Sequence, residues 1–193
     1  MRPCTALLGT VLLACQPQGR ATAPPAIDSV RLREARTAAS ALGSDLLTML
    51  TQELARGGPA AAIAVCADSA QVRTSRHQQA GIVVRRVGTR VRNPANMPDS
   101  LEAAILAAFQ ADLAAGRLPA DTTVLEALAG GHTRLRYLRP VRVQEPCLTC
   151  HGPATGIPDS VRAILAQRYP NDQATGYALG ELRGAVSVQV TQD

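Results

Sequence analysis

The sequence contains no lysine and no tryptophan, and it has little aromatic character of any kind. Its 193 residues include three tyrosines and one phenylalanine. The formal net charge of +5 is therefore carried by arginine alone. Proteins that bind nucleic acid combine dense basic patches with aromatic side chains that stack on bases. Both features are missing, so nucleic acid is not an expected partner.

The sequence is also poor in cysteine for a disulfide scaffold and too apolar for a disordered chain. It has five cysteines in 193 residues, and 46% of its residues are hydrophobic. Small disulfide-stabilised domains are much denser in cysteine, and disordered chains are much less apolar. This length and composition predict one folded domain with a core of its own. The composition leaves open what fills a core that has so few aromatic side chains.

The first residues have the pattern of a bacterial export signal. Arg2 precedes an apolar run over residues 6–14, which is too short to span a membrane as a helix. The run ends in Leu-Leu-Ala-Cys at Cys15, which resembles a lipobox, whose cysteine is acylated and becomes the new N-terminus. A plain secretory signal, in which Cys15 is incidental, is the alternative.

Three regions follow from this pattern. We expect residues 1–14 to be a signal peptide, which removes Cys4, and residues 15–27 to be a lipidated tether rich in small residues and proline. Residues 28–193 then form a domain that faces the periplasm and is anchored by lipid to the inner or outer bacterial membrane.

Hydrophobic spacing predicts helices in the first part of this domain. Apolar residues return at helical spacing over residues 28–56 and stop at Gly57-Gly58. Pro59 then begins a second helix, whose apolar side carries Cys66. A third helix is predicted after Asp99, which has the residue type of an N-cap.

Strands are predicted mostly in the later part. Residues 82–92 are β-branched and alternate, with valines on one face and arginines on the other. Residues 135–143 and 184–189 also alternate, and a glycine-rich stretch over 180–184 has the composition of a hairpin turn. A short helix is expected after Asp159. This order predicts an α+β domain with a mostly antiparallel sheet.

The sequence Cys147-Leu148-Thr149-Cys150-His151 is a haem c attachment motif. Two residues between the cysteines let both thiols add to the vinyl groups of one haem, and the adjacent histidine becomes an axial ligand of the iron. Three other interpretations of the motif fit less well. A structural zinc site needs a second pair of ligands, which the sequence does not offer, and a thioredoxin-like site needs a βαβ unit, which is not predicted. A disulfide between Cys147 and Cys150 would close a small, strained loop. Export agrees with haem c, since attachment takes place outside the cytosol.

The second axial ligand remains open from the residues alone. In small electron carriers it is a methionine after the motif, but no methionine follows His151. A four-helix cytochrome with an open position does not fit the predicted strands. Cys66 is either a thiolate ligand or a small buried apolar residue. The remaining candidates are Met49, His77, Met97 and His132, or no ligand at all.

Six segments together resemble a bacterial and cyanobacterial family of c-type haem domains, which occur alone or as sensor modules of histidine kinases. They are AAAIAVC (60–66), VRRVGTRVRNPANMPD (84–99), YLRP (137–140), CLTCHG (147–152), YPND (169–172) and GYALGELRGAVSV (176–188). The resemblance implies a PAS-like antiparallel sheet with an N-terminal helical extension. It also implies a haem attached to Cys147 and Cys150 and ligated by His151 and Cys66.

The resemblance gives a role to the arginine-rich strand and the loop after it. The haem propionates are expected to bind Arg86, Arg90, Arg92 or Asn93, although a solvated face would also explain any one of these arginines.

The expected function is that of a sensor of redox state or of a small gas such as NO, CO or O₂. Iron ligated by both Cys66 and His151 has no open position, so the chain is not expected to be an enzyme. An electron carrier is the first alternative, and a haem peroxidase or a domain without haem is less favoured. The partner is expected to be a redox or signalling protein. Unlike the sensor kinases, the sequence ends at Asp193 without a kinase, which leaves that partner open.

Overall fold

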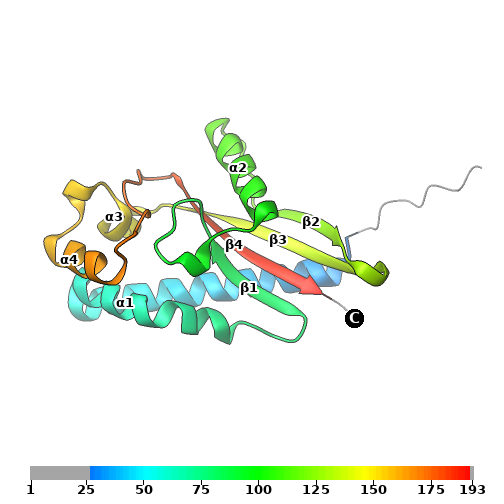
Figure 1. Cartoon of the computed structure of the whole chain (residues 1–193), viewed down its shortest axis with the longest axis horizontal. Helices are drawn as coiled ribbons and strands as arrows, with labels where there is room; N and C mark the ends of the chain where they lie inside the picture. The colour runs from blue at the N-terminus through cyan, green and yellow to red at the C-terminus, as the bar shows by residue number, and fades with distance from the viewer. Residues whose placement is uncertain (1–26, 192–193) are drawn as a thin grey trace, which may run out of the picture.

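A helical hairpin opens the part of the chain that this computed structural model describes, residues 27–191 (Figure 1). Helix α1 spans Ser29–Arg76 and is interrupted at Gly58, whose backbone has φ 70° and ψ −169°. Glycine adopts this conformation without strain, and Pro59 directly after it begins the second arm. The predicted break between two helices is confirmed. The predicted signal peptide and Cys15 lie outside the described residues.

Polar contacts tie the two arms of α1 together. Asp45 on the first arm lies 2.5 Å from Arg73 Nη1 on the second arm and 3.1 Å from His77 Nε2 just beyond it. These contacts fix how the second arm lies along the first. They therefore set the position of Cys66, which lies on the second arm between Gly58 and Arg73.

Four antiparallel strands form a single sheet. They are β1 (Ile82–Val87), β2 (Thr122–Ala127), β3 (Thr133–Arg142) and β4 (Leu182–Thr191). Their order across the sheet is β1-β4-β3-β2, so the strand that comes last in the chain lies between β1 and β3. The predicted α+β class with an antiparallel sheet is confirmed.

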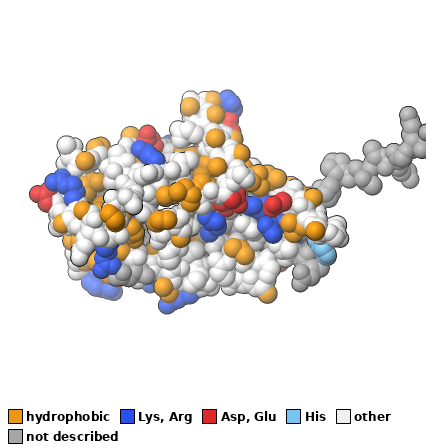
Figure 2. Space-filling view, viewed as in Figure 1, with side chains coloured by type: hydrophobic (Ala, Val, Ile, Leu, Met, Phe, Trp, Pro, Cys, Tyr) orange, Lys and Arg blue, Asp and Glu red, His pale blue; other side chains and the backbone are white. Residues whose placement is uncertain are grey.

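Both faces of the sheet are covered, and each covering helix makes its own apolar cluster. The first arm of α1 packs on one face, through Ala35, Ala39 and Leu42 against Val84, Leu135, Tyr137, Val186, Val188 and Val190. Helix α2 (Ser100–Ala114) packs on the other face, through Ile105, Leu106 and Phe109 against Val87, Leu138, Leu182 and Ala185. The exposed residues of α2 are mostly alanine, and several hydrophobic side chains are visible along this projecting helix in Figure 2.

The remaining short helices gather at one end of the sheet, next to the turn of α1 (Figure 1). Helix α3 spans Glu145–His151 and helix α4 spans Asp159–Arg168. Ile63, beyond the break in α1, packs with Ile157, Val161 and Leu165, and Cys150 contacts this cluster. Within residues 27–191, no helix is long and apolar enough to cross a membrane.

Three predictions about the strands are wrong in detail. Strand β1 ends at Val87 because the Gly88 N–H bonds to the carbonyl oxygen of Asn96, at 3.2 Å, instead of continuing the ladder. The buried valine next to α1 is Val84, whereas Val83, expected on the apolar face, is exposed. The glycine-rich stretch over 180–184 is not a hairpin turn, because β4 begins at Leu182.

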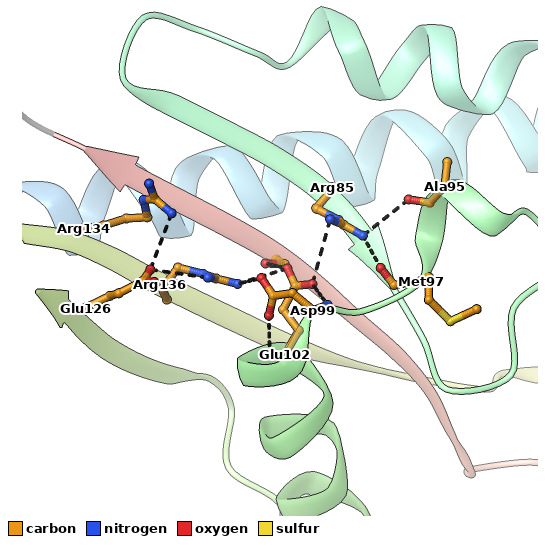
Figure 3. Close-up of polar contacts among 9 residues, drawn as sticks. Arg85, Ala95, Met97, Asp99, Glu102, Glu126, Arg134 and Arg136 are labelled. Carbon is orange, nitrogen blue, oxygen red and sulfur yellow. Dashed lines mark hydrogen bonds and ion pairs between the residues drawn. The ribbon is translucent and has the colours of Figure 1, made fainter. Parts of the chain in front are cut away.

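A polar network lies between the sheet and α2 (Figure 3). Asp99 and Glu102 form a reciprocal cap at the start of α2, which confirms Asp99 as the N-cap. The fully buried Glu102 carboxylate accepts a hydrogen bond from Ser187 Oγ of β4, at 2.7 Å, and lies 3.4 Å from Arg136 of β3. Arg136 is 3% exposed and also pairs with Asp99, at 2.6 Å. The network fixes α2 to the two central strands.

We expect the substitution Arg136→Met to lower the free energy of unfolding by about 3–5 kcal/mol, because it leaves the buried Glu102 without its nearest cation. Arg134→Met is the matched control, since Arg134 lies on the same strand and pairs with Glu126 at 3.5 Å but is more exposed. The control is expected to lose less than about 1 kcal/mol. Urea denaturation measures both losses, and equal losses would contradict the role given to Arg136.

Candidate functional site

Helix α3 arranges the three residues of the CxxCH motif. It begins after Gln144, carries Pro146 in its first turn and ends at Gly152, whose N–H bonds to the carbonyl oxygen of Leu148 at 2.8 Å. A Cβ atom at position 152 would lie 2.6 Å from that oxygen, so the turn requires glycine. Cys147 and Cys150 are three residues apart in one helix and therefore lie on the same side of it. Cys66, Cys147 and Cys150 are all free thiols.

His151 is held in one tautomer by a backbone acceptor. Its Nδ1 lies 2.6 Å from the carbonyl oxygen of Ala174, so Nδ1 carries the proton and donates it. Burial, followed by the positive charges of Arg183 and Arg92, lowers the pKa of His151 to about 3. The imidazole is therefore neutral, and Nε2 keeps a free lone pair. Metal-ligating histidines have this arrangement, with one ring nitrogen fixed by a hydrogen bond and the other available.

A cavity of about 340 Å³ brings the predicted site residues together. One wall is formed by both arms of α1, with Leu46, Met49, Leu50, Ile63 and Cys66. Most of the rest of the lining is formed by the sheet and by α3, with Cys147, Cys150 and His151. Two segments about eighty residues apart in the chain thus place their sulfur and nitrogen atoms around one space. Most of the other lining atoms are apolar.

Cys66 is partly buried in this cavity near Cys150. Burial raises the pKa of the Cys66 thiol, and the neighbouring Cys150 raises it further, whereas Arg86 acts in the opposite direction. Burial also raises the pKa of Cys150. Neither thiol is a thiolate at neutral pH without a further positive charge in the cavity.

Of the other candidates for a second axial ligand, Met49 alone shares the cavity. Met49 is 4% exposed and lines the same wall as Cys66. His77 lies at the far end of the second arm beside Asp45, His132 is exposed beyond β2, and Met97 is 54% exposed. The structure therefore narrows five candidate residues to two.

Four arginines line the cavity, and no carboxylate does so among the side chains that the structure describes. The arginines are Arg86, Arg92, Arg142 and Arg183, and Asn93 also lines it. The guanidinium of Arg86 has no hydrogen bond or ion pair to another described residue, and its Nε is buried without a partner. Burial lowers the pKa of Arg86, and the nearby Arg183 lowers it further. Among the described side chains, the guanidinium of Arg86 thus has no counter-ion.

Arg90 does not lie in the cavity, contrary to the prediction for it. Its guanidinium stacks on the Tyr177 ring at 3.5 Å and pairs with Glu181 at 3.2 Å. The reason is that β1 ends at Val87, so the strand alternation that would place Arg90 beside Arg86 no longer applies.

Arg183 is a lining residue that sequence reasoning missed. In the β3–β4 ladder Val141 pairs with Gly184 and Arg142 with Leu182, which leaves Arg183 as the extra residue of a β-bulge. The glycine-rich composition of residues 180–184 indicates irregular backbone at this point. The sequence favours a turn there, whereas the structure has a bulge. The bulge lets Arg183 line the cavity together with the adjacent Gly184.

The comparisons with known proteins agree with this architecture. A family model with the description "Tll0287-like: Tll0287" matches residues 22–191 of this chain. The crystal structure of the cyanobacterial heme-protein Tll0287 is similar to this chain with a TM-score of 0.61 and 22% sequence identity, over 86% of this chain and 98% of that one. At this identity the likeness concerns the fold. No match was found among curated proteins. The family match covers most of the sequence, and the chain belongs to the Tll0287-like family.

Proposed function

We propose that this chain is a lipid-anchored, periplasm-facing haem c protein that acts as a sensor of redox state or of a small gas. The observation that carries the proposal is the cavity in which Cys66, Cys147, Cys150 and His151 meet. Membership of the Tll0287-like family and the likeness to a structure described as a heme-protein support it.

The donor set of the cavity fits a haem better than a bare metal ion. Among the described side chains, no three His, Cys, Asp or Glu residues cluster so as to hold a metal ion. A haem brings four nitrogen ligands of its own and needs one or two more from the protein. It also needs apolar walls for its ring and cations for its two carboxylates. The cavity offers all three.

Each residue of the motif has a separate task in this proposal. Cys147 and Cys150 would form the two thioether bonds, and their spacing on α3 sets where the ring edge lies. His151 would offer Nε2 to the iron while Nδ1 stays fixed on Ala174. When bound, the haem supplies a one-electron Fe(III)/Fe(II) couple. Because Nδ1 donates a hydrogen bond to a carbonyl oxygen, the His151 ring is a stronger electron donor than a free imidazole.

Arg86 and Arg183 would hold the haem carboxylates. Both line the cavity, and neither forms an ion pair with a described carboxylate. A buried cation without a counter-ion is costly, and a propionate would supply the missing charge. Asn93 is a further candidate donor at the cavity wall. Arg92 is a weaker candidate, because its guanidinium already binds Asp172 and the carbonyl oxygen of Cys150.

A sensor is favoured because Cys66 lies on the second arm of α1, and the first arm of the same hairpin packs on the sheet (Figure 1). A change in iron ligation at Cys66 would act directly on that helix. The alternative is electron transfer, which is favoured by the firm hold on His151 and by ligands on both sides of the cavity. The same ligand pair leaves no position for substrate turnover, so we do not propose an enzyme. The partner would be a redox or signalling protein.

The first test concerns covalent attachment. Co-expression with a haem c maturation system is expected to give a denatured protein whose mass exceeds that of the polypeptide by one haem. Cys147→Ala/Cys150→Ala is expected to lose this covalent haem, because both thioether bonds are gone. Cys66→Ala is the control and is expected to keep it. A wild-type protein without covalent haem refutes the proposal.

The second test identifies which sulfur would bind the iron in addition to His151. Cys66→Ala is expected to abolish the low-spin thiolate signal in the ferric EPR spectrum and to raise the midpoint potential, since thiolate favours Fe(III). Met49→Leu removes the other sulfur in the cavity with little change in volume, and it is expected to keep the wild-type spectrum. A wild-type spectrum that has no thiolate signal, changes in Met49→Leu and is unchanged in Cys66→Ala would assign the ligand to Met49.

The third test separates a gas sensor from an electron carrier. If the chain senses gas, adding CO or NO to the reduced protein is expected to change its visible spectrum, because the gas displaces Cys66 from the iron. Reversible redox titration of the same sample serves as the reference. A reversible potential with no spectral response to either gas would favour the carrier.

A further inference from the structure

The loop between α4 and β4 folds back over α3 and reaches the CxxCH motif through backbone hydrogen bonds. The N–H of Tyr177 donates to the carbonyl oxygen of His151 at 2.9 Å, and the N–H of Gly176 donates to that of Gly152 at 2.8 Å. The carbonyl oxygen of Ala174 accepts the Nδ1 proton of His151 at 2.6 Å. The orientation of the His151 ring thus depends on where this loop places Ala174.

A buried ion pair fixes that part of the loop. Asp172 Oδ1 accepts the N–H of Ala174 at 2.8 Å, and Asp172 Oδ2 binds Arg92 Nε at 2.9 Å. The two side chains are only 9% and 10% exposed. Each carboxylate oxygen therefore has its own partner, and the peptide that precedes the His151 acceptor cannot turn without breaking one of these bonds.

Arg92 also holds the motif itself. Its Nη2 donates to the carbonyl oxygen of Cys150 at 2.6 Å, one residue before His151. One rigid guanidinium thus joins the segment after β1, the CxxCH helix and the returning loop. The backbone bond from the Gln173 N–H to the carbonyl oxygen of Val91, at 3.1 Å, adds a second link between the same two segments.

We propose that Arg92 and Asp172 are positioning residues for His151, which fix the orientation of its ring toward the cavity. The inference rests on the proposed function, since it concerns His151 as an iron ligand. An ion pair this well buried adds little stability over apolar side chains of the same volume. Its contribution here is directional, because the flat guanidinium donates to a carboxylate and to a carbonyl at fixed angles. A lysine keeps the charge but cannot make both contacts.

The test uses the protein with haem attached and the variant Arg92→Lys. Because the charge is conserved, a change in the spectrum reports lost geometry and not lost charge. We expect the single low-spin EPR species of the wild-type protein to broaden or split, since the imidazole ring takes up more than one orientation. An unchanged EPR spectrum in this variant, with or without a lower melting temperature, would overturn the proposal. The Arg92–Asp172 pair would then have a structural role alone.

Asp172→Asn is the second variant, and it tests the positioning role if Arg92→Lys does not fold. It keeps an oxygen acceptor for the Ala174 N–H but loses the charged bond to Arg92, so the same EPR change and an upward shift of the midpoint potential are expected. Glu181→Gln is the matched control. Glu181 also pairs with an arginine, Arg90, and accepts a backbone N–H, but on the surface. Equal effects of the two substitutions would overturn the proposal.

Failure of the inference is distinguishable from failure of the proposed function. A wild-type protein that carries no covalent haem refutes the proposed function and this inference with it. A wild-type protein that carries haem, together with variants whose EPR spectra do not change, refutes only the positioning role of Arg92 and Asp172.

Discussion

The cavity depends on the insertion of β4 between β1 and β3. These two strands are joined only through β4, so the wall formed by the sheet does not exist until the last described residues are in place. In that wall Arg86 lies opposite Val186, and Val141 lies opposite Gly184. At Gly184 the backbone of β4 passes so close to β1 that a Cβ atom would lie 2.1 Å from the carbonyl oxygen of Val87. The site is thus completed by the C-terminal strand, although its proposed ligands lie in α1 and α3.

The distribution of the few aromatic side chains explains how this chain fills its core. Phe109, Tyr137 and Tyr177 are all fully buried, and each belongs to a different apolar cluster. Alanine, valine and leucine fill the rest of these clusters. No fully buried aromatic side chain lines the cavity, where Tyr169 is the only aromatic residue and is partly exposed. A porphyrin would supply there the flat apolar group that the described side chains do not.

The sequence predicts those features that depend on local chemistry. The Gly58-Pro59 break, the cap at Asp99 and the strands β1, β3 and β4 follow from glycine, proline and alternation. Strand β2 was missed because it is a short edge strand in which no residue is buried, so it lacks the alternating pattern. Arg90 and Arg183 were misjudged because the end of β1 and the bulge in β4 are set by tertiary contacts. The approach of Cys66 to His151 followed from the family resemblance alone. The PAS-like description and the export signal remain predictions.

The two proposed axial ligands are held in different ways, and this difference bears on how a sensor would respond. His151 is fixed by its ring hydrogen bond, by its own carbonyl oxygen and, through Ala174, by the Arg92–Asp172 pair. The side chain of Cys66 has no hydrogen bond to another described residue, and its position depends on how the second arm of α1 packs after Gly58. In the proposed sensor, an incoming ligand would therefore replace Cys66 more easily than His151. The change would then act on the second arm of α1, which Asp45 ties to the first arm that packs on the sheet. An electron carrier needs neither this asymmetry nor a ligand on so long a helix, so the asymmetry favours the sensor.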